Sequence, residues 1–281
     1  MKTILVIANE TLGGAKLLET VEEKAQAAGD DARIVICVPR NRPKHGNVIY
    51  DDFVFGAAQV RIDLARTFLS LRGIRAIGEV GDPDPYTAAM DAVAEFNPDE
   101  IIVSTFPMST SGWLRRDLIE RISDSAGVPV HHVVIDIDAE GLPFAVTLVV
   151  ANRTTSSDDL LDCMKDKAKD AREHLFIACI PQEGTGHMAP AKARAHLAQL
   201  IDRARGERLL CAGMIADPDP YTATMNALQL FRVDDIIIST LPATRSGWQR
   251  ADLVERVTKA SHKEVAHVEA TDVGDRAEVT R

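Results

Sequence analysis

Two stretches of the sequence combine hydroxyl side chains with a glycine in the way that anion-binding loops do. Asp99–Glu120 reads DEIIVSTFPMSTSGWLRRDLIE, and Asp234–Glu255 reads DDIIISTLPATRSGWQRADLVE. In each, an apolar run predicts a buried strand, and a polar loop precedes a helix that we expect to open at Ser-Gly-Trp. Helix N–H groups and the helix dipole favour phosphate there. The candidate phosphate-binding residues are Ser104, Thr105, Ser109, Thr110, Ser111, Gly112 and Trp113, and Ser239, Thr240, Thr244, Ser246, Gly247 and Trp248.

A purely structural interpretation of the same residues stays open. Ser111 and Ser246 have the residue type of helix N-caps, which stabilise a helix by about 1 kcal/mol without any ligand. Trp113 and Trp248 either line a pocket or pack the helix start against the sheet. The loop therefore predicts either a site for a phosphate-bearing ligand or a closed structural junction.

The two stretches belong to a tandem duplication. Between residues 82–122 and 217–257, 24 of 41 positions are identical. The first strands also match, because LVIAN at 5–9 corresponds to LVVAN at 148–152. Repetition on this scale indicates two copies of one domain, which we place at residues 1–139 and 143–272.

Each copy alternates short apolar runs with helical patterns. In the first copy we expect strands near 4–8, 33–38, 74–80, 101–104 and 130–135, and helices over 17–28, 57–71, 85–96 and 113–123. This pattern predicts an α/β fold: two tandem doubly wound domains, each a five-stranded parallel sheet with about four helices. Ligands of such sheets bind beyond the carboxyl ends of the strands. That rule adds Ala8, Asn9, Gly81, Ala151 and Asn152 to the candidate residues.

The two asparagines allow two interpretations. Their amides could hydrogen-bond a ribose or a base. Alternatively, Asn9 and Asn152 form an Asx turn where the first strand ends.

Composition excludes several classes of function. The net charge is −10, the pI is about 5.3 and aromatic residues make up 5%, which argues against a nucleic-acid or anionic-membrane partner. The four cysteines form no CxxC pair, and the histidines have no metal-ligand spacing, so we expect no metal. No GxSxG, GxGxxG or GxxxxGK[ST] motif occurs. The start of the sequence has no signal-peptide pattern and no 18-residue apolar run follows, so we expect a cytoplasmic protein.

Several motifs together resemble the universal stress protein family, in its tandem two-domain form common in actinobacteria. They are ILVIAN at 4–9, GDPDP at 81–85, and the DEIIVST…SGWLRRDLIER block followed by VPVHHVVID. The resemblance covers nearly all of both copies. It implies a Rossmann-like, adenine-nucleotide-hydrolase-like fold for each copy, and possible binding of ATP, ADP or AMP.

The sequence departs from the ATP-binding members of this family at both parts of their site. Asn9 and Asn152 replace an aspartate at the end of strand one. Ser104-Thr105 and Ser239-Thr240 replace the start of a glycine-rich loop, and its closing Gly-[Ser/Thr] is absent. The resemblance therefore predicts a ligand-responsive or scaffolding stress-response protein with a degenerate loop. It also implies intramolecular pairing of the two copies and a possible homodimer. The alternatives are a slow nucleotide hydrolase and an interaction module without a small ligand.

Overall fold

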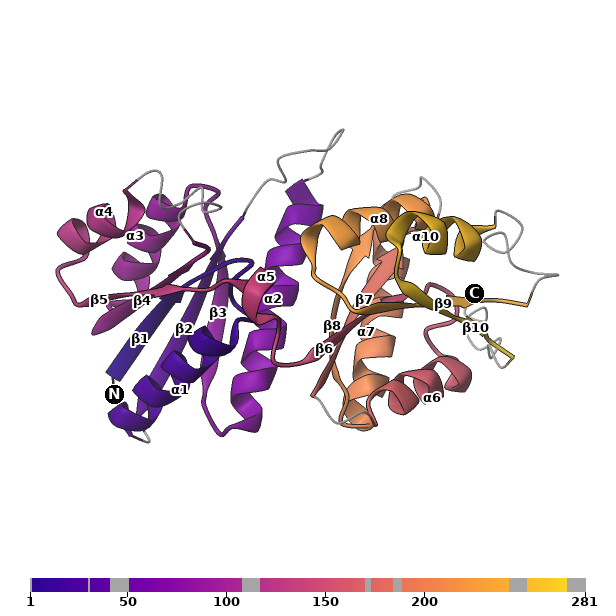
Figure 1. Cartoon of the computed structure of the whole chain (residues 1–281), viewed down its shortest axis with the longest axis horizontal. Coiled ribbons are helices and arrows are strands. Elements are labelled where there is room, and N and C mark those ends of the chain that lie inside the picture. Colours follow the sequence, from indigo (N-terminus) through magenta and orange to yellow (C-terminus); the bar gives the residue numbers. More distant parts are fainter. Residues whose placement is uncertain are drawn as a thin grey trace, which may run out of the picture. The chain divides into compact units, whose positions relative to one another are not determined.

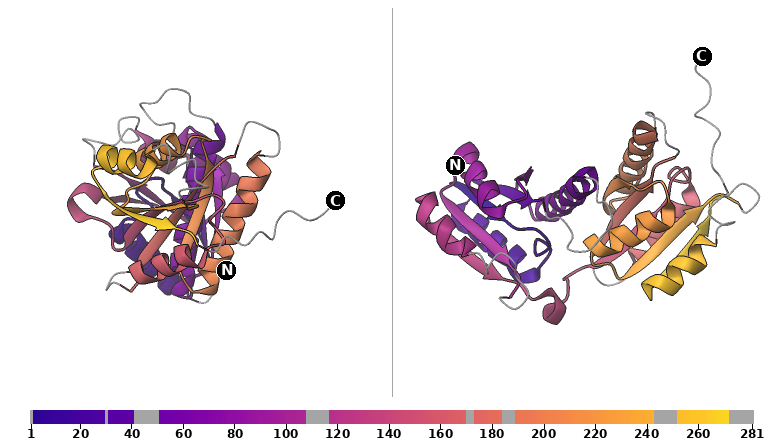
Figure 2. Two further views of the ribbon diagram at one scale, coloured as in Figure 1. Left: turned by 90° about the vertical axis from the view of Figure 1, so that its right-hand side faces the viewer. Right: turned by 90° about the horizontal axis from the view of Figure 1, so that it is seen from above.

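The computed structural model describes residues 2–29, 31–40, 51–107, 117–169, 173–183, 189–242 and 252–271. The chain divides into two compact units, Met1–Pro143 (unit one) and Phe144–Arg281 (unit two) (Figure 1). Each unit is described by itself. Both are built from helices that cover a parallel sheet, as further directions of view also show (Figure 2).

Unit one contains a five-stranded parallel sheet in the order β3-β2-β1-β4-β5. Its strands are β1 (Lys2–Ile7), β2 (Ala32–Pro39), β3 (Ala76–Gly81), β4 (Glu100–Thr105) and β5 (Val130–Val134). Its helices are α1 (Ala15–Ala28), α2 (Asp51–Leu71), α3 (Pro85–Phe96), α4 (Leu118–Ala126) and the short α5 (Ile137–Glu140). The chain order of the strands reverses direction between β1 and β4, which makes their carboxyl ends the switch point of the sheet.

Unit two repeats this architecture with the strand order β10-β9-β6-β7-β8. Its strands are β6 (Ala145–Val150), β7 (His174–Pro181), β8 (Leu210–Ala216), β9 (Asp235–Thr240) and β10 (Glu264–Glu269). Its helices are α6 (Asp158–Lys167), α7 (Ala189–Gly206), α8 (Pro220–Leu230) and α10 (Leu253–Ser261). The predicted fold class, two doubly wound α/β domains with five-stranded parallel sheets, is confirmed.

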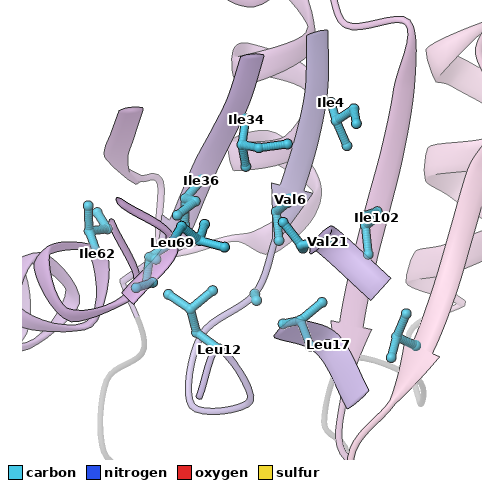
Figure 3. Close-up of a cluster of buried hydrophobic side chains, with 14 of the residues drawn as sticks. Ile4, Val6, Leu12, Leu17, Val21, Ile34, Ile36, Ile62, Leu69 and Ile102 are labelled. Carbon is cyan, nitrogen blue, oxygen red and sulfur yellow. The ribbon is translucent and has the colours of Figure 1, made fainter. Parts of the chain in front are cut away.

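Both faces of the sheet in unit one are covered, which explains why its strands are continuous apolar runs. Successive side chains alternate between the faces. Ile4, Val6 and Ile36 pack under α1 and α2 (Figure 3), whereas Leu5 and Ile7 pack under α3 and α4. This packing holds the ends of β1 and β4 in fixed positions.

The helices α3 and α8 begin in the same way. Asp84 accepts a hydrogen bond at 3.0 Å from the backbone N–H of Thr87, and Asp219 accepts one at 2.9 Å from that of Thr222. A proline follows each aspartate at the first helical position. Asp84 and Asp219 are therefore the N-caps of these two helices.

The predicted start of the fourth helix is wrong. α4 begins at Leu118, because Asp117 has φ +49° and lies in the left-handed region, which a right-handed helix cannot include. Asp252 has the same φ before α10. A helix that opens at Ser-Gly-Trp therefore does not continue into α4 or α10.

Candidate functional site

The sheets bring the exit of the first strand beside that of the fourth. Ile7 of β1 pairs with Val103 of β4, so Ala8 and Asn9 lie next to Ser104 and Thr105. In unit two, Val150 of β6 pairs with Ile238 of β9. Ala151 and Asn152 accordingly lie next to Ser239 and Thr240. Eight predicted site residues thus gather at two equivalent switch points.

One further threonine lies at each switch point and was not among the predicted site residues. The Thr11 hydroxyl donates to the Ser104 carbonyl at 3.4 Å, and the Thr154 hydroxyl donates to the Ser239 carbonyl at 3.3 Å. Both threonines are buried. The available signal was the shared spacing, since each threonine stands two residues after the site asparagine.

The serine hydroxyls at these two switch points are buried and make no hydrogen bond to the described residues. Ser104 and Ser239 are each 1% exposed. Within the described ranges, neither Oγ has a hydrogen-bond partner. Burying a hydroxyl without a hydrogen bond costs about 1–3 kcal/mol, so a group that occurs twice in this state needs an explanation.

The neighbouring threonines contact histidines instead. Thr105 Oγ1 lies 2.9 Å from His132 Nε2 and donates to the Phe106 carbonyl at 2.9 Å. Thr240 Oγ1 lies 2.8 Å from His267 Nε2. Burial lowers the pKa of His132, which favours its neutral form. These histidines tie the last two strands of each sheet together.

Each asparagine uses its amide N–H₂ on the neighbouring strand. Asn9 donates to the Pro39 carbonyl and Asn152 to the Pro181 carbonyl, both at 2.6 Å. The predicted equivalence of the two residues holds for this bond. It fails for the amide oxygen. Asn152 Oδ1 lies 2.7 Å from His196 Nδ1, whereas Asn9 Oδ1 has no hydrogen-bond partner in the described part of the chain.

Gly81 stands apart from the other candidates, at the end of β3, two strands away from β1. A Cβ at this position would lie 2.7 Å from Ala88 Cβ and 2.9 Å from Cys37 Sγ. Close packing against α3 therefore accounts for the glycine without a ligand.

The remaining predicted residues lie outside the described residues. These are Ser109, Thr110, Ser111, Gly112 and Trp113 in the first loop, and Thr244, Ser246, Gly247 and Trp248 in the second.

Metal ligands and membrane-crossing helices were searched among the described residues. These contain no group of three or more His, Cys, Asp or Glu side chains that could hold a metal ion. In the same ranges, no helix has the length and apolar character needed to cross a membrane.

The comparisons with known proteins place universal stress proteins among the structural neighbours. No protein-family model and no curated protein matches the chain. A universal stress protein from Archaeoglobus fulgidus is 18% identical, with 97% of each chain covered and a TM-score of 0.35. A universal stress protein family protein from Arabidopsis thaliana with AMP bound is 15% identical over 50% of this chain and 95% of its own, with a TM-score of 0.34. A universal stress protein in complex with cAMP is 16% identical over 48% of this chain and 98% of its own, also with a TM-score of 0.34.

Proposed function

We propose that this chain is a tandem universal stress protein that acts in the cytoplasm as a ligand-responsive or scaffolding stress-response protein. Its ligand is a nucleotide or another phosphate-bearing molecule, bound at the carboxyl ends of β1 and β4 or of β6 and β9. The sequence motifs support the family, and the strand order supports the position of the site.

The observation that carries the proposal is the buried Ser104 hydroxyl, repeated at Ser239. Each lies at the switch point of its sheet, beside an asparagine whose amide is fixed by the next strand. A ligand with hydroxyl or phosphate oxygens would supply the hydrogen bond that these serines do not make to the described residues. The hydroxyl-rich loops that follow β4 and β9 suit the same chemistry.

Isothermal titration calorimetry tests this proposal. ATP, ADP, AMP and cAMP are titrated into the full chain with and without Mg²⁺. We expect binding of at least one nucleotide, and weaker binding to a Ser104→Ala/Ser239→Ala double variant. No heat at millimolar nucleotide would eliminate nucleotide binding and favour an interaction module without a small ligand. Phosphate release that persists through repurification would instead indicate a slow nucleotide hydrolase.

We also propose that the two copies pair with each other and that the chain forms homodimers. β5 and β10 are edge strands in their sheets, so one side of each backbone is open to further pairing in the described structure. Light scattering after size exclusion measures the mass in solution. A mass of a single chain at all protein concentrations would rule out the homodimer.

A further inference from the structure

The two switch points differ in the side chains of one neighbouring helix, which is α2 in unit one and α7 in unit two. In unit two, one face of α7 carries His196, Gln199 and Arg203, spaced three and four residues apart. All three side chains contact the loop that follows β6. These side chains therefore occupy hydrogen-bonding groups of the loop that a ligand at this switch point would otherwise contact.

Each α7 side chain satisfies a different part of that loop. His196 Nδ1 lies 2.7 Å from Asn152 Oδ1, which requires a proton on this nitrogen because an amide oxygen only accepts. Thr155 donates to Gln199 Oε1 at 3.2 Å. Arg203 donates to the Ser157 carbonyl at 2.8 Å and to the Asp158 carboxylate.

The backbone shows which residues of unit one occupy the equivalent positions. The loops start with the same turn, Leu12 N–H to the Asn9 carbonyl and Thr155 N–H to the Asn152 carbonyl. The helices end alike, since Ile74 N–H bonds the Leu69 carbonyl and Leu209 N–H bonds the Ala204 carbonyl. These matches align His196, Gln199 and Arg203 with three residues of α2: Arg61, Leu64 and Phe68.

Unit one keeps only part of this set. Arg61, at the position of His196, is a hydrogen-bond donor that interacts electrostatically with Glu10 of the loop after β1, whereas the other two positions are apolar. Leu64 and Leu12 replace the hydrogen-bonded pair of Gln199 and Thr155. Phe68 occupies the position that corresponds to Arg203, which hydrogen-bonds the loop in unit two. The copies also differ at Asn9, which is 3% exposed and whose Oδ1 has no hydrogen-bond partner among the described residues.

We infer that the duplicated site has diverged, so that unit one binds the ligand and α7 fills the equivalent site of unit two. This inference rests on the proposed function and adds a stoichiometry of one ligand per chain. It also constrains the ligand chemistry. Asn9 Oδ1 accepts only, so the group that meets it must donate an N–H or O–H, as a ribose hydroxyl or an exocyclic amine does.

The test uses matched single variants of the full chain, titrated with the nucleotide that binds best to the wild type. Ser104→Ala and Ser239→Ala form the first pair. Neither removes a hydrogen bond between described residues, so folding is a minor concern. Asn9→Ala and Asn152→Ala form the second pair. Both remove one bond to a proline carbonyl, and Asn152→Ala also removes the contact with His196.

We expect one site per chain in the wild type. Ser104→Ala and Asn9→Ala should each weaken binding by about fivefold to tenfold, which is the effect of one lost hydrogen bond. Ser239→Ala and Asn152→Ala should each weaken binding clearly less than the matching variant of unit one. Circular dichroism of each variant confirms that it is folded.

The possible contrary results separate this inference from the proposed function. Two equivalent sites per chain, or equal weakening by both members of a pair, overturn the divergence of the copies and leave nucleotide binding intact. Binding that is lost only in the Ser239→Ala and Asn152→Ala variants also overturns it. No nucleotide binding by the wild type overturns the proposed function and this inference with it.

Discussion

His196 Nδ1 lies 2.7 Å from Asn152 Oδ1, and this contact joins the middle of α7 to the residue that follows β6. Asn152 is 6% exposed, so the bond forms largely out of water. Its other amide group is held by the Pro181 carbonyl. The asparagine is therefore satisfied on both sides by its own unit.

A double-mutant cycle measures the worth of this contact. We expect His196→Ala to destabilise the protein by about 1–2 kcal/mol, because it leaves Asn152 Oδ1 buried without a donor. Asn152→Ala and the double variant complete the cycle, with urea unfolding as the measurement. The coupling energy should be about 1 kcal/mol. Strict additivity would show that the contact contributes nothing.

The stability of the protein should fall as the pH is lowered from 8 to 5.5. Burial lowers the pKa of His132 below the value of 6.5 that applies to an unperturbed histidine. As the pH falls through 6.5, the unfolded chain binds a proton at this residue more readily than the folded chain does, so protonation favours unfolding. His196 acts in the same direction, since burial is the largest influence on its pKa and lowers it.

Urea unfolding of the wild type and a His132→Asn variant checks this pH dependence. Asparagine can still meet Thr105, but it does not titrate. The variant should lose less stability than the wild type over the same pH range. Parallel curves would mean that His132 does not contribute.

The two helix caps offer a matched comparison of the units. Asp84→Ala and Asp219→Ala each remove the hydrogen bond to the N–H of a threonine three residues on. Each variant should lose about 1 kcal/mol of stability. The pKa of Asp84 is lowered chiefly by the hydrogen bond from the Thr87 N–H. NMR titration of that carboxyl group should therefore show a pKa below 3.8, the value for an unperturbed aspartate.

The cysteines should resist thiol reagents in the folded protein. Burial raises the pKa of Cys179 and of Cys211 to about 12 and also raises that of Cys37. Only the thiolate reacts, and it is scarce at pH 8. Reaction with a chromogenic disulfide at pH 8 should be slow, with half-buried Cys163 modified first. Rapid reaction of several thiols before addition of urea would contradict this ordering.

The sequence by itself determined the duplication and the fold class, and it predicted a position for the site. Apolar runs between amphipathic helices are sufficient to predict a doubly wound sheet, and the rule for its switch point then selects Asn9 and Ser104. The identity between the two copies, however, gave no indication that their sites have different hydrogen-bond partners. Identity is concentrated in residues 82–122 and 217–257, away from the helices α2 and α7.

Only the tertiary structure decided which polar groups are satisfied. Asn152 Oδ1 has its donor from a residue 44 positions away in sequence, which the packing of α7 on the sheet brings close, whereas Asn9 Oδ1 has no partner among the described residues. The start of α4 was decided in the same way, by the left-handed backbone of Asp117, since an aspartate carries no strong local signal for that conformation. Local patterns fix secondary structure, but hydrogen-bond partners across elements depend on geometry that the pattern does not contain.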